Sequence, residues 1–160
     1  MESAIALIIS LLLVAAAAST GIRYRPDSWY EQLLKPNWNP PNWLFPVAWS
    51  ILYIMMAVAA WRVVLAEPAA LKWLALFLYL LQLGFNAAWS YLFFGRKNIR
   101  LAFIDLSLLW VSLVLTVFLF MQVDPIAGWM LLPYLLWATF AGALNGRILQ
   151  LNPDGAAQTN

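Results

Sequence analysis

The chain has 160 residues and a formal net charge of +2, and its composition is 64% hydrophobic, 16% aromatic and only 10% charged. This balance lies far outside that of soluble domains and indicates a membrane protein, and its few scattered basic residues exclude a nucleic-acid binding surface. The sequence has no cysteine and no histidine, which excludes disulfides, thiolate nucleophiles, imidazole bases and almost every zinc, copper or iron–sulfur site.

Successive apolar segments follow one another along the chain, and each reaches the roughly 20 residues that a helix needs to cross a bilayer core. Because the runs are unbroken and rich in leucine and alanine, their backbone groups must be paired within helices rather than in a barrel. The predicted fold is all-α: an integral membrane bundle of five transmembrane helices with a long ordered first loop. The expected spans are residues 3–22, 44–66, 71–94, 101–121 and 126–149.

The lengths of the connections predict how these helices are arranged. The links after the second, third and fourth spans are short, so consecutive helices should pack antiparallel as neighbours. The first link, residues 23–43, is much longer. We therefore expect a single domain over residues 1–150, and a flexible polar tail over residues 151–160.

Lysine and arginine are distributed unequally between the two ends of such a bundle. With an odd number of spans, the first loop, the third loop and the C-terminus share one side. Because basic loops stay cytoplasmic, the sequence predicts a cytoplasmic C-terminus and an N-terminus outside. The basic residues on the predicted cytoplasmic side are Arg23, Arg25, Lys35, Arg96, Lys97, Arg100 and Arg147, whereas the other side has Arg62 and Lys72.

The first loop ends in the stretch KPNWNPPNW, residues 35–43, which combines prolines with two tryptophans. Proline fixes its own φ and restricts the residue before it, so this stretch should be extended and stiff. Trp38 and Trp43 have two interpretations. They are either interfacial belt residues or parts of a lid, which the length and rigidity of the loop favour.

Polar residues within the spans are informative because an unpaired polar group at bilayer depth is costly. Asn86 and Gln82 share one face of the third span, and Asn145 lies within the fifth. The two asparagines serve either hydrogen bonds between helices or a ligand cavity. Asp105, one turn inside the fourth span, either faces that cavity or pairs with Arg100, Lys97 or a backbone donor.

Tryptophans lie too deep in the spans for all of them to be belt residues. They suit a large flat ligand, or they fill gaps between helices. Small residues at four-residue spacing permit close helix approach, within the bundle or in a dimer. The deep tryptophans are Trp49, Trp89, Trp110 and Trp137, and the small residues are Gly84 with Ala88, and Ala138 with Gly142 and Gly146.

Four motifs in the same order and spacing resemble the translocator protein family, also called tryptophan-rich sensory proteins or peripheral benzodiazepine receptors. They are WYEQLLKPNWNPPNW with FPVAWSILY, QLGFNAAWSYLFFG, AFIDL and PYLLWATFAGALN. The resemblance covers nearly the whole chain and is to a bacterial member. It implies a multi-pass protein of a bacterial membrane, usually a homodimer. Such proteins bind porphyrins and, in some members, cholesterol or benzodiazepine-site drugs, and no cofactor or metal is required.

The resemblance also implies a ligand-binding site under the first loop. Two departures from the family pattern stand out. Gly146 replaces the tyrosine of the sterol-recognition pattern of animal members, which argues against sterol binding there, and Leu101 occupies a position where some members have tryptophan. The implied site residues are Tyr30, Trp38, Trp49, Asn86, Trp89, Asp105, Trp137, Ala141 and Leu144.

Three functional classes remain open at this point: a carrier or transporter, a sensor, and an enzyme. The chain is expected to bind tetrapyrroles such as protoporphyrin, in transport or in sensing. The alternatives are light-dependent porphyrin breakdown, in which Trp49 and Trp137 would be the photoactive residues, and carriage of sterols or other lipid-like ligands. Because there is no His or Cys to ligate iron, a metal-free porphyrin fits better than haem.

Overall fold

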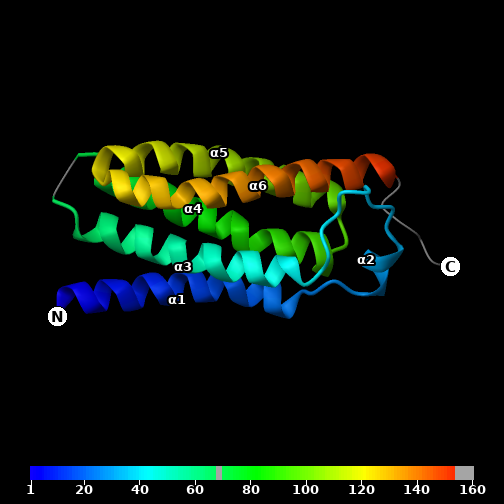
Figure 1. The fold of residues 1–160 in the computed structure, drawn as a ribbon, viewed down its shortest axis with the longest axis horizontal. Coiled ribbons are helices and arrows are strands. Elements are labelled where there is room, and N and C mark those ends of the chain that lie inside the picture. Colours follow the sequence, from blue (N-terminus) through cyan, green and yellow to red (C-terminus); the bar gives the residue numbers. More distant parts are fainter. Residues whose placement is uncertain (68–69, 154–160) are drawn as a thin grey trace.

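The structure, a computed structural model, describes residues 1–67 and 70–153. Within these residues, five helices are long and apolar enough to cross a membrane, and they lie side by side in one elongated bundle (Figure 1). The predicted all-α fold of five transmembrane helices is confirmed. In chain order the elements are α1 (Glu2–Arg23), the short α2 (Ser28–Gln32), α3 (Leu44–Leu65), α4 (Lys72–Ser90), the π-helical turn η1 (Tyr91–Gly95), α5 (Ile99–Val123) and α6 (Pro125–Leu151).

Local sequence signals set the ends of the last two helices. The Asn98 side chain caps α5 by accepting a hydrogen bond from the Leu101 N–H at 2.9 Å. Asp124 alone separates α5 from α6, and its carboxylate accepts hydrogen bonds from the Ile126 and Ala127 N–H groups. The turn is so tight that a Cβ on Gly128 would lie 2.8 Å from a backbone atom of Met121. These caps pair backbone groups that helix ends otherwise leave free.

The five long helices close into a ring. Helix α1 packs against α3 and α4, α6 packs against α3 and α5, and α4 packs against α5. Small residues such as Ala57, Ala59 and Ala75 are completely buried where the helices meet. Large apolar side chains point outward instead, among them Phe77 and Leu136. This arrangement suits a bilayer, where lipid solvates the outer side chains and polar groups belong inside.

The first loop folds over one end of the bundle, next to η1 and the end of α6 (Figure 1). Two contacts fix it there. Lys97, whose φ is 52°, forms an ion pair with Asp27 at 3.0 Å. Asn152 accepts a hydrogen bond from the Leu34 N–H at 3.1 Å and donates one to the Leu34 carbonyl at 2.9 Å. The loop is therefore held by α4–α5 residues at its start and by the end of α6 near its middle.

The opposite end of the bundle has its own ion pair, between Arg62 of α3 and Asp124, at 2.9 Å. The start of α1 lies at this end and the end of α6 at the loop end, as an odd number of spans requires (Figure 1). Leu151 and the buried Asn152 belong to the bundle. The rest of the expected flexible tail, residues 154–160, lies outside the described residues. Which end faces the cytoplasm stays a prediction.

We expect Asn152→Ala to release the first loop from α6 while the helices stay intact. The substitution removes the side-chain amide that pairs both backbone groups of Leu34, and buried hydrogen bonds contribute about 1 kcal/mol each. Hydrogen exchange in residues 28–43, measured by mass spectrometry, should accelerate by about tenfold. Asn152→Asp retains an acceptor for the Leu34 N–H but replaces the donor to the Leu34 and Ile148 carbonyl oxygens by a second acceptor, so it should also accelerate exchange. Equal exchange in Asn152→Ala and the parent would contradict this account.

Candidate ligand-binding site

A chain of hydrogen bonds crosses the middle of the bundle. The Tyr53 hydroxyl donates to Asn86 Oδ1 at 2.6 Å, and Asn86 Nδ2 donates to the Tyr134 hydroxyl oxygen at 3.0 Å. The Tyr134 hydroxyl then donates to Gln82 Oε1 at 2.9 Å. The chain joins α3, α4 and α6. Asn86 therefore forms the hydrogen bonds between helices that one of its two interpretations predicted. These bonds fix the depths of α3, α4 and α6 relative to one another.

Aromatic rings pack against this polar chain, and further rings lie between it and the first loop. Trp49 packs against the rings of Tyr53 and Tyr134, with centroids 5.5 and 5.9 Å away. Nearer the loop is a group that we call the α6 aromatic cluster. Its ring centroids are 5.5 to 6.0 Å apart, and Trp38 connects the first loop to α6 through Phe140. The members of the α6 aromatic cluster are Trp38, Phe45, Trp137 and Phe140.

A second group, the α4 aromatic cluster, forms around η1. Trp89 stacks on Phe93 with centroids 5.0 Å apart, and Tyr30 of α2 meets Phe94 edge-on at 5.5 Å. The π-helical turn at the end of α4 presents both phenylalanines to the loop, and such turns often occur at functional sites. The members of this cluster are Trp29, Tyr30, Trp89, Phe93 and Phe94.

Asn145 explains how Trp89 is held. The Trp89 indole N–H donates to Asn145 Oδ1 at 3.1 Å, and Asn145 Nδ2 donates to the Ile99 carbonyl at 3.2 Å. Leu144 is buried in the same apolar core as Tyr30. Because Asn145 is only 2% exposed, it is a structural link among α4, α5 and α6 that orients one wall of the site.

Several buried polar atoms have no hydrogen-bond partner. Among the described residues they are the Nε atom of Arg62, the indole nitrogen of Trp137, one carboxylate oxygen of Asp105 and the amide nitrogen of Gln82. Buried polar groups are nearly always paired, so such atoms require an explanation, and an absent ligand or water is one. Of the two cations considered as partners of Asp105, neither Arg100 nor Lys97 forms an ion pair with it among the described residues, and Lys97 pairs with Asp27 instead.

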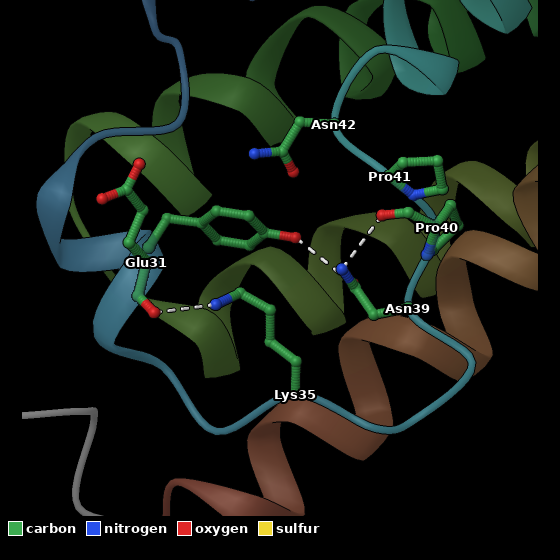
Figure 2. A pocket seen from close by; sticks show the side chains of 7 residues that line it. Glu31, Lys35, Asn39, Pro40, Pro41 and Asn42 are labelled. Carbon is green, nitrogen blue, oxygen red and sulfur yellow. Dashed lines mark hydrogen bonds between the residues drawn. The ribbon is translucent and has the colours of Figure 1, made fainter.

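The loop borders an open pocket of about 370 Å³ (Figure 2). Its lining residues come from α2 and the proline-rich stretch. The Tyr30 hydroxyl points toward Asn39 Oδ1 at 3.4 Å, and the Lys35 ammonium lies 4.7 Å from the centre of the Tyr30 ring and 3.1 Å from the Glu31 carbonyl oxygen. Burial raises the pKa of Tyr30 and lowers the pKa of Lys35. The pocket combines the Tyr30 phenol, the Lys35 cation, the Glu31 carboxylate and amide groups beside apolar proline rings.

The structure brings most of the expected site residues together, in two groups. Trp49, Asn86 and Trp137 lie on the α3–α6 side, with Ala141 packed at the edge of the same core. Tyr30, Trp89 and Leu144 lie on the α4 side. Asp105 is buried on α5, which packs against α4 and α6. Trp38 is 48% exposed and borders a groove on the outside of the bundle.

Sequence analysis missed Tyr53 and Tyr134, which complete the polar chain. Both carry a signal that could have been used. Tyr53 is one helical turn after Trp49, and Tyr134 is three residues before Trp137, so each shares a face with an expected site residue. Asn152 had no such signal, because its partner Leu34 lies 118 positions away.

These features define a class: a multi-pass membrane protein with a tryptophan-rich interior closed at one end by a proline-rich loop. The chain belongs to the TspO/MBR family, which it matches over residues 4–151. It is 46% identical over 140 residues to protein CrtK of Rhodobacter capsulatus, covering 87% of this chain and 88% of the relative. It is 42% identical over 142 residues to the tryptophan-rich sensory protein of Cereibacter sphaeroides, with 89% and 88% covered. The translocator protein of Ovis aries is 38% identical over 133 residues, with 82% and 79% covered.

We expect Asn86→Leu to destabilise the bundle, because it leaves the Tyr53 hydroxyl without its acceptor and removes a donor from Tyr134. The loss should be about 2 kcal/mol or more, measured as a fall of several degrees in Tm in detergent. The double variant Asn86→Leu with Tyr53→Phe removes the orphaned hydroxyl and should recover part of this loss. A double variant that loses the sum of both single effects would contradict the polar chain as described.

Proposed function

We propose that this protein binds porphyrin-type tetrapyrroles beneath the first loop and acts in their sensing or transport. The unpaired, buried indole nitrogen of Trp137 within the α6 aromatic cluster carries the proposal. Large rings supply stacking surface for a flat ligand, and a few unpaired polar atoms fix its orientation. Trp49 adds a further stacking surface, and the carboxylate of Asp105 adds a further unpaired polar atom.

The shape of the site supports a ligand that enters from the loop end. The pocket of Figure 2 opens beside Tyr30 and the proline-rich stretch, and the α6 aromatic cluster lies on the inner side of that stretch, through the contact of Trp38 with Phe140. A tetrapyrrole larger than this pocket needs the rings of Phe45, Trp137 and Phe140 to separate. The loop then acts as the cover of the site.

The relatives favour sensing as the role of this binding. The relative from Cereibacter sphaeroides is named a tryptophan-rich sensory protein. We further propose that the loop end is cytoplasmic in a bacterial membrane, because the basic residues concentrate there. A homodimer fits this proposal, since Gly84 on α4 is exposed and a Cβ added there would meet nothing within 4 Å.

A second candidate function is light-dependent porphyrin breakdown, favoured by the position of Trp49 and Trp137 beside the proposed ligand. Absorbance of purified protein with protoporphyrin, followed in light and in darkness, separates the two. Decay of the porphyrin bands in light that is lost in Trp49→Phe and Trp137→Phe would favour breakdown. Bands that persist in light favour binding alone.

Trp137→Leu should weaken porphyrin binding by about tenfold, because it removes one stacking surface and its indole N–H while the span stays apolar. Binding is measured by titrating the change in porphyrin absorbance in detergent. The matched control is Trp110→Leu, which also removes an indole, but on the outer side of α5. Equal affinity of the Trp137 variant and the parent would refute the site.

Pro41→Gly tests whether the first loop is already rigid before a ligand binds. Pro41 is exposed at the rim of the pocket, so its removal takes away one apolar contact and restores freedom that closing the loop must then remove, at about 1 kcal/mol. The matched control Pro41→Ala also removes the ring but restores less backbone freedom, so it should weaken binding less. We expect about fivefold weaker porphyrin binding with an unchanged Tm. The rival account is a charge clamp, in which Lys35→Gln loses affinity while Pro41→Gly binds like the parent.

A further inference from the structure

A groove of about 620 Å³ lies on the outside of the bundle between α5 and α6 and shares Trp38 with the site described above. Trp110 and Val111 of α5 form one wall and are 40% and 53% exposed. The α6 side is built from Gly142, Ala143 and Gly146. Because these exposed walls belong to spans, the groove faces the acyl chains of the membrane.

The groove is mostly apolar, open at Gly142 and narrower at Gly146, where an added Cβ would lie 3.1 Å from the Phe103 ring. A Cβ added to Gly142 would meet nothing within 4 Å, so the absence of a side chain there leaves space rather than a packed contact. The polar groups of the walls are satisfied within the protein. The Trp110 indole N–H donates to Thr139 Oγ1 at 2.8 Å, and the Thr139 hydroxyl donates to the Leu135 carbonyl at 2.8 Å. What the groove presents to the membrane is therefore hydrocarbon surface.

The loop end of the groove is charged. Arg147 and Gln150 line it, and Arg147 Nη1 donates to Gln150 Oε1 at 3.0 Å. Arg147 forms no ion pair with any of the described residues. It lies one turn before the end of α6 at Leu151, where a helix meets the headgroup layer. From Gln150 to Ala138 the groove is about 18 Å long at 1.5 Å per residue, which is close to half of a ~30 Å hydrocarbon core.

We propose that this groove binds one phospholipid with an anionic headgroup. One acyl chain lies along Gly146 and Gly142 from the headgroup layer toward the middle of the membrane, and the phosphate pairs with Arg147. Charge complementarity selects this occupant. A sterol offers only a hydroxyl and leaves the guanidinium unpaired, and a helix of a second copy would cover Arg147 without neutralising it. The proposal does not rest on porphyrin binding, although Trp38 belongs to both regions.

The bound lipid has a consequence for the first loop. Trp38 borders the same groove and contacts Phe140 of the α6 aromatic cluster. A lipid chain beside Trp38 adds apolar contact to this otherwise 48% exposed side chain and favours the closed loop. Anionic lipid should therefore slow hydrogen exchange in the proline-rich stretch.

The test is native mass spectrometry of the full chain in detergent, with phosphatidylglycerol and phosphatidylcholine added in equal amounts. The parent should retain one phosphatidylglycerol in preference to phosphatidylcholine. Arg147→Gln should lower that preference by about fivefold, the effect of one charge near an anionic headgroup, while lipid is still bound. Gly142→Leu fills the groove and should abolish retention of either lipid.

The matched control is Ala15→Leu, which adds the same bulk at an exposed position on α1; it should retain lipid as the parent does. Tm measurements establish that each variant is folded. Unchanged headgroup preference in Arg147→Gln would overturn the proposal. Cholesterol that displaces phosphatidylglycerol at equal concentration would identify a sterol groove instead. A shift from dimer to monomer in Gly142→Leu, with lipid retention unchanged, would identify an interface between two copies.

Discussion

The structure depends on one constraint: polar side chains inside a membrane bundle must find one another. The hydrogen bonds from Tyr53 through Asn86 and Tyr134 to Gln82 meet this constraint across three helices. Apolar packing alone tolerates sliding and rotation of a helix in lipid, because lipid and protein side chains are equally apolar. The polar chain removes that freedom, and the aromatic walls of the site are fixed in place because their residues lie one turn away from its members.

The first loop lies outside the hydrocarbon core, and contacts of another kind hold it in place. Its start is held by the ion pair of Asp27 with Lys97, and its middle by the side chain of Asn152. The Lys97 ammonium also holds the pKa of Asp27 below its usual range. The ion pair is therefore present above that pKa and is lost as the pH falls through it. Between the two anchors and α3 runs the proline-rich stretch, which needs few contacts of its own because its prolines already restrict the backbone.

Helix α6 has one face inside the bundle and another face on the outer groove. Tyr134, Trp137 and Asn145 point into the bundle, where they join the polar chain, the α6 aromatic cluster and the link to Trp89. Gly142 and Arg147 border the outer groove. The helical repeat of 3.6 residues separates these sets. A ligand inside and a lipid outside would therefore act on the same helix, and Trp38 touches both regions.

The sequence by itself determined the five spans, their order, the long stiff loop and the depth of Asn86, Asp105 and Asn145, because length and hydropathy in a membrane are local properties. The tertiary structure alone decided which partners these residues meet. It paired Lys97 with Asp27 rather than Asp105, joined Asn86 to two tyrosines, and placed Asn152 on Leu34. Such pairings depend on the rotation and relative depth of segments far apart in the chain, which no local pattern records.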